Sequence, residues 1–169
     1  MDSRRKEFEQ IVDQYGERLY RQIRRMVLDH DDANDVLQNT FIKAWNGLPS
    51  FEGRAHLSSW LYRIAVNEAL DFLRKKKQYL SLSDSDSEGC SVASRLMADE
   101  YFDGDETAAK LQQAVAELPQ MQRLVFQLKY FEGKKYSEIS EILGKSEGTL
   151  KASYHIAVKK ISAFLEQHD

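Results

Sequence analysis

The stretch YSEISEILGKSEGTLKASYHIAVKKISAFL, residues 136–165, decides the fold of the C-terminal third of the chain. Its apolar residues recur at helical spacing on either side of Gly144-Lys145-Ser146, which predicts a short helix over 136–143 and a longer one over 147–165. Ser146 is a residue type that caps helix N-termini. A short helix, a tight turn containing glycine and a longer helix together indicate a helix-turn-helix.

The second helix of this pair carries cations on one face. Lys151, His155 and Lys159 are spaced i, i+4 and i+8, opposite the apolar stripe that contains Leu150 and Ala157. Because the start of such a helix enters the major groove, long cations there suit phosphates and guanine edges. The candidate duplex-contacting residues are Glu147, Gly148, Thr149, Lys151, His155 and Lys159. The pattern is equally compatible with an ordinary helical hairpin whose lysines face solvent.

The N-terminal part of the chain predicts three further helices around one small core. Apolar residues keep a helical period over 8–27 and again over 36–48, and Asp31 and Asp32 suit the start of the second helix as cap and dipole charge. A third helix is expected over about 58–77. The residues expected to be buried on this third helix are Leu61, Ile64, Ala65 and Phe72.

A second face of the third helix has a composition suited to nucleic acid. Trp60, Arg63, Asn67 and Arg74 recur at i, i+3, i+7 and i+14. An aromatic ring beside arginine and asparagine fits a surface that stacks on bases and holds phosphates. Cations near a helix C-terminus are favoured by the helix dipole in any case, and tryptophan is equally a core residue type. From these residues alone, a plain helix is the favoured interpretation.

Charge is unevenly distributed along the 169 residues, although the net charge is only -3. Residues 1–78 hold 14 Lys and Arg against 12 Asp and Glu, and residues 109–169 hold nine against seven, so each segment has a net charge of +2. Residues 79–108 hold one basic and eight acidic residues, a net charge of -7. The sequence therefore predicts an all-α fold of two small helical domains, 1–78 and 109–169, joined by an acidic flexible linker, 79–108.

Several classes of protein are disfavoured by the residues present. One cysteine cannot form an internal disulfide, and no Cys/His set has zinc-finger spacing. No apolar run is long enough for a spanning helix or a signal peptide, so a soluble, cytoplasmic protein is expected. The cluster Asp29–Asp35 fails as a calcium loop, because its sixth position is Asn34 and its twelfth is Thr40. We therefore expect no metal, no cofactor and no catalytic residue.

Two separate stretches resemble the conserved regions of bacterial RNA polymerase sigma factors. Residues 35–45, 51–53 and 60–67 are similar to the second region, and residues 118–151 are similar to the fourth, including Leu118-Pro119 and the helix-turn-helix. The third region of larger sigma factors is replaced by the acidic linker. This layout resembles the extracytoplasmic-function (ECF) type. The resemblance covers both modules and nearly everything except the linker and the chain ends.

The resemblance implies a role for each surface. In this family the second helix docks on the largest catalytic subunits of core RNA polymerase, which here implies Asp35, Gln38, Asn39 and Ile42. The following loop and the third helix melt the minus-ten element and capture a flipped base, and the helix-turn-helix recognises the minus-thirty-five element as duplex. The residues implied in minus-ten binding are Phe51, Trp60, Arg63, Asn67 and Arg74. An anti-sigma factor, often membrane-anchored, usually holds such proteins inactive.

Some residues depart from the family pattern. Ser153 and Ile156 stand where many members carry arginines on the recognition helix, and Lys135 stands where Ser or Thr often caps the first helix of the pair. The linker of the family threads near the polymerase active-site cleft, but a flexible spacer is an equal interpretation of this acidic segment.

The resemblance implies a sigma factor that works at the nucleoid when bound to polymerase, and the residues leave two other functions open. A two-module regulator that binds duplex operators without polymerase remains the alternative, since it would also need a helix-turn-helix. A small metal-dependent hydrolase using Asp29–Asp35 has little support. A duplex-only regulator has no need of the surfaces that contain Gln38 and Asn67, so these surfaces separate the hypotheses.

Overall fold

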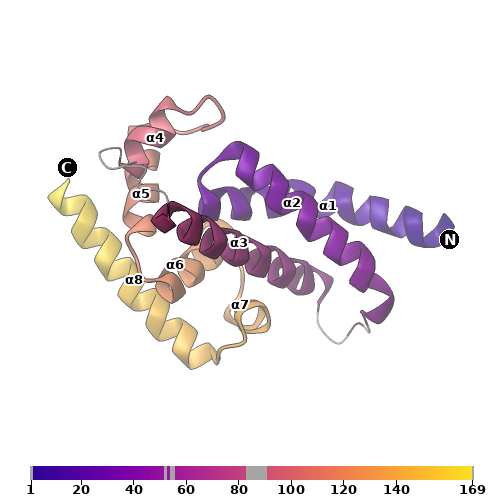
Figure 1. The fold of residues 1–169 in the computed structure, drawn as a ribbon. Helices are drawn as coiled ribbons and strands as arrows, with labels where there is room; N and C mark the ends of the chain where they lie inside the picture. The colour runs from indigo at the N-terminus through magenta and orange to yellow at the C-terminus, as the bar shows by residue number, and fades with distance from the viewer. Residues whose placement is uncertain (1, 52, 54–55, 83–90, 169) are drawn as a thin grey trace. The chain divides into compact units, whose positions relative to one another are not determined.

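The computed structural model describes residues 2–51, 53, 56–82 and 91–168. All regular structure in these ranges is helical, which confirms the expected all-α fold class. The chain divides into two compact units, the first comprising residues 1–83 and 141–143 and the second residues 84–140 and 144–169. Figure 1 labels the helices α1 to α8. None of the helices in the described ranges combines the length and hydropathy needed to cross a bilayer.

Three helices and one 3-10 turn build the first unit. They are α1 (Asp2–Val27), α2 (His30–Gly47), η1 (Leu48–Ser50) and α3 (Leu57–Leu82). Each of these three α-helices packs against the other two, which encloses one small apolar core. The fully buried side chains of this core include Leu19, Ile23, Val36, Leu61, Tyr62 and Val66.

The buried face of α3 differs from the expected one. Leu61 and Ala65 are buried, whereas Ile64 and Phe72 are partly exposed. The expected stripe suits a helix with one neighbour, but α3 meets both α1 and α2, so its buried face is wider and is turned toward both. The residues buried instead are Tyr62, Val66 and Ala69.

The start of α2 is fixed by a cap two residues earlier than expected. Leu28 has a left-handed backbone conformation, with φ of 64°, and Asp29 takes the cap position. The carboxylate of Asp29 accepts a hydrogen bond from the backbone N–H of Asp32 at 2.9 Å. Asp31 and Asp32 lie in the first turn, where negative charge favours the helix dipole. Lys76 Nζ lies 2.9 Å from Asp32 Oδ2, which joins the end of α3 to the start of α2.

The second unit contains four α-helices, one π-helical segment and the first part of a further helix, α7, whose residues 141–143 belong to the first unit. They are α4 (Val92–Ala98), α5 (Glu106–Ala116), α6 (Gln120–Phe126), the π-helical η2 (Gln127–Phe131), α7 (Tyr136–Leu143) and α8 (Glu147–Gln167). The expected helix-turn-helix is present, and its two helices begin at the predicted residues. Helix α8 packs against α5 and α6. The cluster at the centre of this packing is Ala114, Val115, Leu118, Phe126, Ala157 and Ile161.

Helix α4 lies within the segment 79–108 that the sequence assigned to a flexible linker. Ser91 caps it, accepting from the backbone N–H of Ser94 at 3.1 Å, and Leu96 is only 4% exposed where α4 packs on α5. Part of the expected linker range is therefore regular helix, since α4 covers residues 92–98 and α3 continues to Leu82. One buried leucine in a short helix gives no periodic signal, so its docking on another helix could not be inferred. Residues 83–90 of the expected linker lie outside the described ranges.

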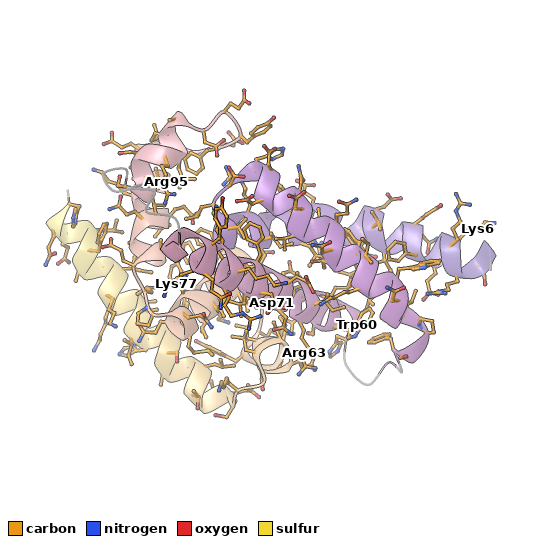
Figure 2. The ribbon with its side chains drawn as sticks, in the orientation of Figure 1. Lys6, Trp60, Arg63, Asp71, Lys77 and Arg95 are labelled. Atoms are coloured by element: carbon orange, nitrogen blue, oxygen red, sulfur yellow. The ribbon has the colours of Figure 1, made fainter. Side chains whose placement is uncertain are left out.

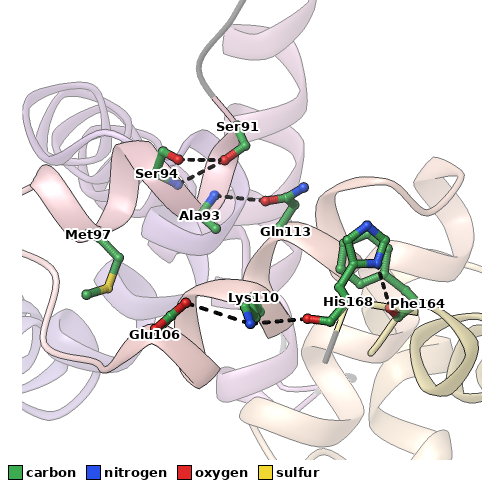
Figure 3. Close-up of a pocket in the computed structure, with 9 residues that line it drawn as sticks. All are labelled: Ser91, Ala93, Ser94, Met97, Glu106, Lys110, Gln113, Phe164 and His168. Carbon is green, nitrogen blue, oxygen red and sulfur yellow. Dashed lines mark hydrogen bonds and ion pairs between the residues drawn. The ribbon is translucent and has the colours of Figure 1, made fainter. Parts of the chain in front are cut away.

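Polar contacts also fix α4 and the chain end beside α5, as Figure 3 shows. The backbone N–H of Ala93 donates to Gln113 Oε1 at 3.3 Å. Lys110 Nζ donates to the carbonyl oxygen of His168 at 3.2 Å and lies 3.7 Å from the carboxylate of Glu106. A cavity of about 520 Å³ opens between α4, α5 and the end of α8.

The substitution Leu96→Ala should release α4 from α5. Removing a buried leucine side chain typically costs about 2–5 kcal/mol, and a helix of this length does not persist alone in water. Amide hydrogen exchange should then become faster over 92–98, while the amides of α8 stay protected. Met97→Ala is the matched control, because Met97 on the same helix is 51% exposed. Unchanged exchange in the Leu96 variant would show that other contacts hold α4.

Candidate functional site

One face of α2 is turned wholly to solvent. Asp35, Gln38, Asn39 and Ile42 recur at i, i+3, i+4 and i+7 and are all exposed, and Ile42 is 53% exposed. The opposite face of α2 is buried and holds Ala33, Val36, Thr40 and Ala44. The structure therefore brings the four residues expected to contact polymerase together on one surface.

An ion pair couples α2 to α3 beside this surface. Lys43 on α2 pairs with Glu68 on α3. The hydrogen bond with Glu68 and the negative charge of its carboxylate raise the pKa of Lys43, and Asp71 adds to the effect. Asp71 also holds Arg74, with Arg74 Nη2 3.1 Å from its Oδ1. Both helices that carry candidate residues are thus joined by charged contacts as well as by the core.

The exposed face of α3 contains the residues expected to bind the minus-ten element. Arg63, Asn67 and Arg74 are exposed and Trp60 is partly exposed. Figure 2 shows Trp60 and Arg63 near the start of α3, with Lys77 toward its other end. Trp60 is therefore not a buried core residue, which was the alternative interpretation of this position.

Phe51 reaches Trp60 across the connection between α2 and α3. The two ring centroids are 4.9 Å apart and the ring planes are inclined by 34°. The turn η1 positions Phe51, because its backbone N–H donates to the carbonyl oxygen of Leu48 at 3.1 Å and Leu48 is buried. Two aromatic side chains expected to bind DNA thus contact each other, while Arg63 and Asn67 lie one and two turns further along α3.

Local backbone signals set the geometry of the helix-turn-helix. Gly144 ends α7 in the left-handed conformation, with φ of 69°, which glycine adopts without a steric penalty. The Ser146 hydroxyl accepts from the backbone N–H of Thr149 at 3.2 Å, so Ser146 caps α8 as expected. At the start of α7, Lys135 supplies no side-chain cap, and instead its backbone N–H donates to Glu138 Oε1 at 2.9 Å.

The start of α8 is exposed over the whole predicted recognition surface. Leu150 and Ala157 are buried on the opposite face and anchor the helix to its own unit. The exposed residues are Glu147, Gly148, Thr149, Lys151, His155 and Lys159. The structure places these six residues on one helix and leaves them accessible to a partner.

Two residues that the sequence did not single out lie beside Lys151. Lys129 Nζ is 4.6 Å and Lys151 Nζ is 5.8 Å from the ring centroid of Tyr136, so both cations contact one aromatic ring. Tyr136 also meets Tyr154 edge to face at 6.4 Å, and burial raises the pKa of the Tyr154 hydroxyl. Lys129 lies in the π-helical segment, where the wider turn shifts side chains away from the 3.6-residue period. A helical pattern could not place it beside Tyr136.

No group of three or more His, Cys, Asp or Glu side chains is arranged to hold a metal ion among the described residues. The arrangement instead offers exposed polar and aromatic faces on three helices. Such faces bind macromolecules by stacking, hydrogen bonding and charge.

Comparison with known protein families matches both halves of the chain. Residues 11–79 match Sigma-70 region 2, and residues 108–161 match Sigma-70, region 4. The chain is similar to the ECF RNA polymerase sigma factor SigW of Bacillus subtilis, with 36% identity over 88% of this chain and 83% of SigW. It is also similar to RNA polymerase sigma factor SigV of the same organism, with 33% identity over 89% and 86% of the two chains.

Solved structures share the fold of this chain. The sigma factor RpoE, in complex with the anti-sigma factor NepR from Bartonella quintana, matches with a TM-score of 0.76 and 26% identity, over 95% of this chain and 98% of RpoE. CnrH, in complex with the cytosolic domain of CnrY, shares the fold with a TM-score of 0.75 and 24% identity, over 98% and 91% of the two chains. By its two matched regions and its similarity to these relatives over most of its length, the chain belongs to the ECF RNA polymerase sigma factors.

Proposed function

We propose that this sigma factor binds core RNA polymerase, directs it to specific promoters and helps to open the promoter DNA. The observation that carries the proposal is the pair of exposed faces on α2 and α3, since the core of the first unit is complete without them. The family membership supplies the partner and the reaction.

The exposed face of α2 is the proposed polymerase-binding surface. Ile42 supplies apolar area, and Asp35, Gln38 and Asn39 around it supply charge and hydrogen-bonding groups. Protein interfaces commonly combine an apolar centre with a polar rim. Docking of α2 on the largest catalytic subunits would bury Ile42 and remove a solvent-exposed isoleucine.

The Phe51–Trp60 pair and the exposed face of α3 form the proposed minus-ten surface. A flipped base needs an aromatic wall, which Phe51 and Trp60 provide, and polar groups for its edge, which Arg63 and Asn67 provide. Arg74 further along α3 is suited to a backbone phosphate. Promoter opening then requires no hydrolysis, because tighter binding of unpaired bases than of duplex shifts the equilibrium toward the open state.

The exposed start of α8 is the proposed minus-thirty-five surface. Lys151, His155 and Lys159 would contact phosphates and base edges, while Gly148 and Thr149 permit close approach of the backbone. Glu147, in the first turn, completes the surface and can accept from a cytosine amino group. The near-neutral charge of each unit fits weak DNA binding alone and reliance on polymerase for avidity.

We further propose that an anti-sigma factor controls this protein by covering one of these surfaces. The support is that RpoE of Bartonella quintana was solved with the anti-sigma factor NepR. We propose that this anti-sigma factor is membrane-anchored. We propose that the sigma factor itself is cytoplasmic and moves to the nucleoid when it is released and binds polymerase. Its role in initiation would require no catalytic activity of its own.

Addition of the purified chain to sigma-free core polymerase tests the proposal against its alternatives. A sigma factor should bind core and initiate transcription from a subset of a promoter library. A duplex-only regulator should bind some of the same DNA without polymerase and start no transcript. Failure both to bind core and to start any transcript would contradict the proposed function.

Gln38→Ala should weaken core binding, and Asn67→Ala should spare core binding and impair promoter opening. Each residue is exposed, so neither substitution should disturb folding. Loss of one interfacial side chain at an important position costs about 1–2 kcal/mol. We therefore expect Gln38→Ala to reduce core affinity about five- to thirtyfold, and Asn67→Ala to reduce promoter opening by about the same factor. Titration of labelled core measures the core affinity of Gln38→Ala, and permanganate reactivity of unpaired thymines measures the promoter opening by Asn67→Ala.

Gln14→Ala on the exposed side of α1 is the control for both variants. Normal promoter opening by Asn67→Ala would contradict the proposed role of the exposed face of α3.

Tyr136→Leu should weaken holoenzyme binding to promoters that depend on the minus-thirty-five element. Leucine keeps apolar volume but removes the ring that Lys129 and Lys151 contact, and each such contact contributes about 0.5–1 kcal/mol. Equilibrium binding of holoenzyme to promoter duplexes with and without that element measures the loss. Tyr130→Leu is the matched control, because Tyr130 is 57% exposed and stacks on Phe126. Equal weakening by both variants would show that Tyr136 has no specific role.

A further inference from the structure

We propose that Gly47 is a positioning residue that holds the indole of Trp60 in the pose needed to capture an unpaired base. This inference rests on the proposed function of Trp60 and adds a residue that contacts no DNA itself. The observation that carries it is a close approach between the last residue of α2 and the first turn of α3.

The side chain of Trp60 lies against the backbone of Gly47. A Cβ atom at position 47 would lie 3.1 Å from Trp60 Cζ2 and 3.7 Å from Trp60 Cη2. The first distance is tighter than an ordinary van der Waals contact, so the indole would have to move by a few tenths of an ångström. An alanine at this position therefore displaces the ring that α3 presents.

The backbone of Gly47 gives no other reason for glycine. Its φ of -90° and ψ of -12° are right-handed helical values that any residue adopts. Alanine also has a higher helix propensity than glycine, so replacement should not weaken the end of α2. The space that the missing side chain leaves for Trp60 is what this position supplies.

The indole of Trp60 also contacts Phe51, so a displacement of the indole changes that contact. Phe51 approaches the indole at 4.9 Å between centroids, and the hydrogen bond from its N–H to the Leu48 carbonyl fixes Phe51 in turn. The backbone N–H of Trp60 donates to the carbonyl oxygen of His56 at 3.0 Å, which holds the start of α3. A ring pushed away from Gly47 must change its inclination to Phe51, and with it the surface offered to a base.

The pose of the indole matters because binding groups must be held to within about half an ångström of their productive geometry. Stacking between a base and an aromatic side chain contributes directly to the binding of unpaired bases. A displaced but intact ring should lose part of this contribution. We therefore expect Gly47→Ala to reduce promoter opening about three- to tenfold without reducing core binding.

Tryptophan fluorescence tests the positioning step without DNA. The chain has two tryptophans, so a Trp45→Phe background isolates the emission of Trp60. Gly47→Ala should shift this emission and change its quenching by acrylamide. Gly16→Ala in the same background is the matched control, because a Cβ at position 16 would lie 4.0 Å from Phe41 Cζ, an ordinary contact. An unchanged spectrum in the Gly47 variant would overturn the inference, provided that thermal unfolding shows both variants folded.

The functional arm compares Gly47→Ala with Trp60→Ala in the full-length protein bound to core polymerase. A changed spectrum with reduced opening by both variants supports the inference. A changed spectrum with normal opening by Gly47→Ala overturns the inference. In that case the result for Trp60→Ala shows whether the proposed function of Trp60 is also wrong. Impaired opening by Trp60→Ala would leave the proposed function of Trp60 standing, whereas normal opening by Trp60→Ala would show that this proposed function is itself wrong.

Discussion

Burial of one stripe of each helix is the constraint on which the functional surfaces depend. In the first unit, Val36 and Ala44 of α2 and Leu61 and Ala65 of α3 are buried against neighbouring helices. Since a helix repeats every 3.6 residues, fixing these inward residues also fixes which residues point outward. The outward residues are those that we propose bind polymerase and DNA. The apolar core therefore holds each proposed surface in place without contributing a side chain to it.

Local signals explain which parts of the fold were predictable. The turn of the helix-turn-helix was predicted to the residue, because Gly144 ends α7 and Ser146 caps α8 through their own backbone and nearest turn. Helix α4 was missed, because it depends on Leu96 packing against a helix that begins ten residues later. The buried face of α3 was predicted only in part, because a stripe of apolar residues does not show how many neighbours a helix will have.

In the candidate sites too, features set by local sequence were predictable and features set by contacts between helices were not. Exposure of the α2, α3 and α8 faces followed from periodicity, and the residues on them were named from the resemblance to sigma factors. The contact between Phe51 and Trp60 and the place of Gly47 beside them could not be predicted, since they depend on how the chain turns between two helices. Lys129 was missed for another reason: the π-helical turn moves it out of the regular helical phase.

Helix α8 carries the proposed DNA-binding residues near one end and buried core residues near the other. Its 21 residues span roughly 32 Å at the helical rise per residue. The first turns present Lys151 and His155, while Ile161 near the other end is buried in the core and Phe164 packs against it. Because the proposed DNA-contacting residues and the buried residues share one continuous backbone, α8 cannot tilt without disturbing that core. The proposed DNA contacts should therefore change more readily through exchange of exposed side chains than through reorientation of the helix.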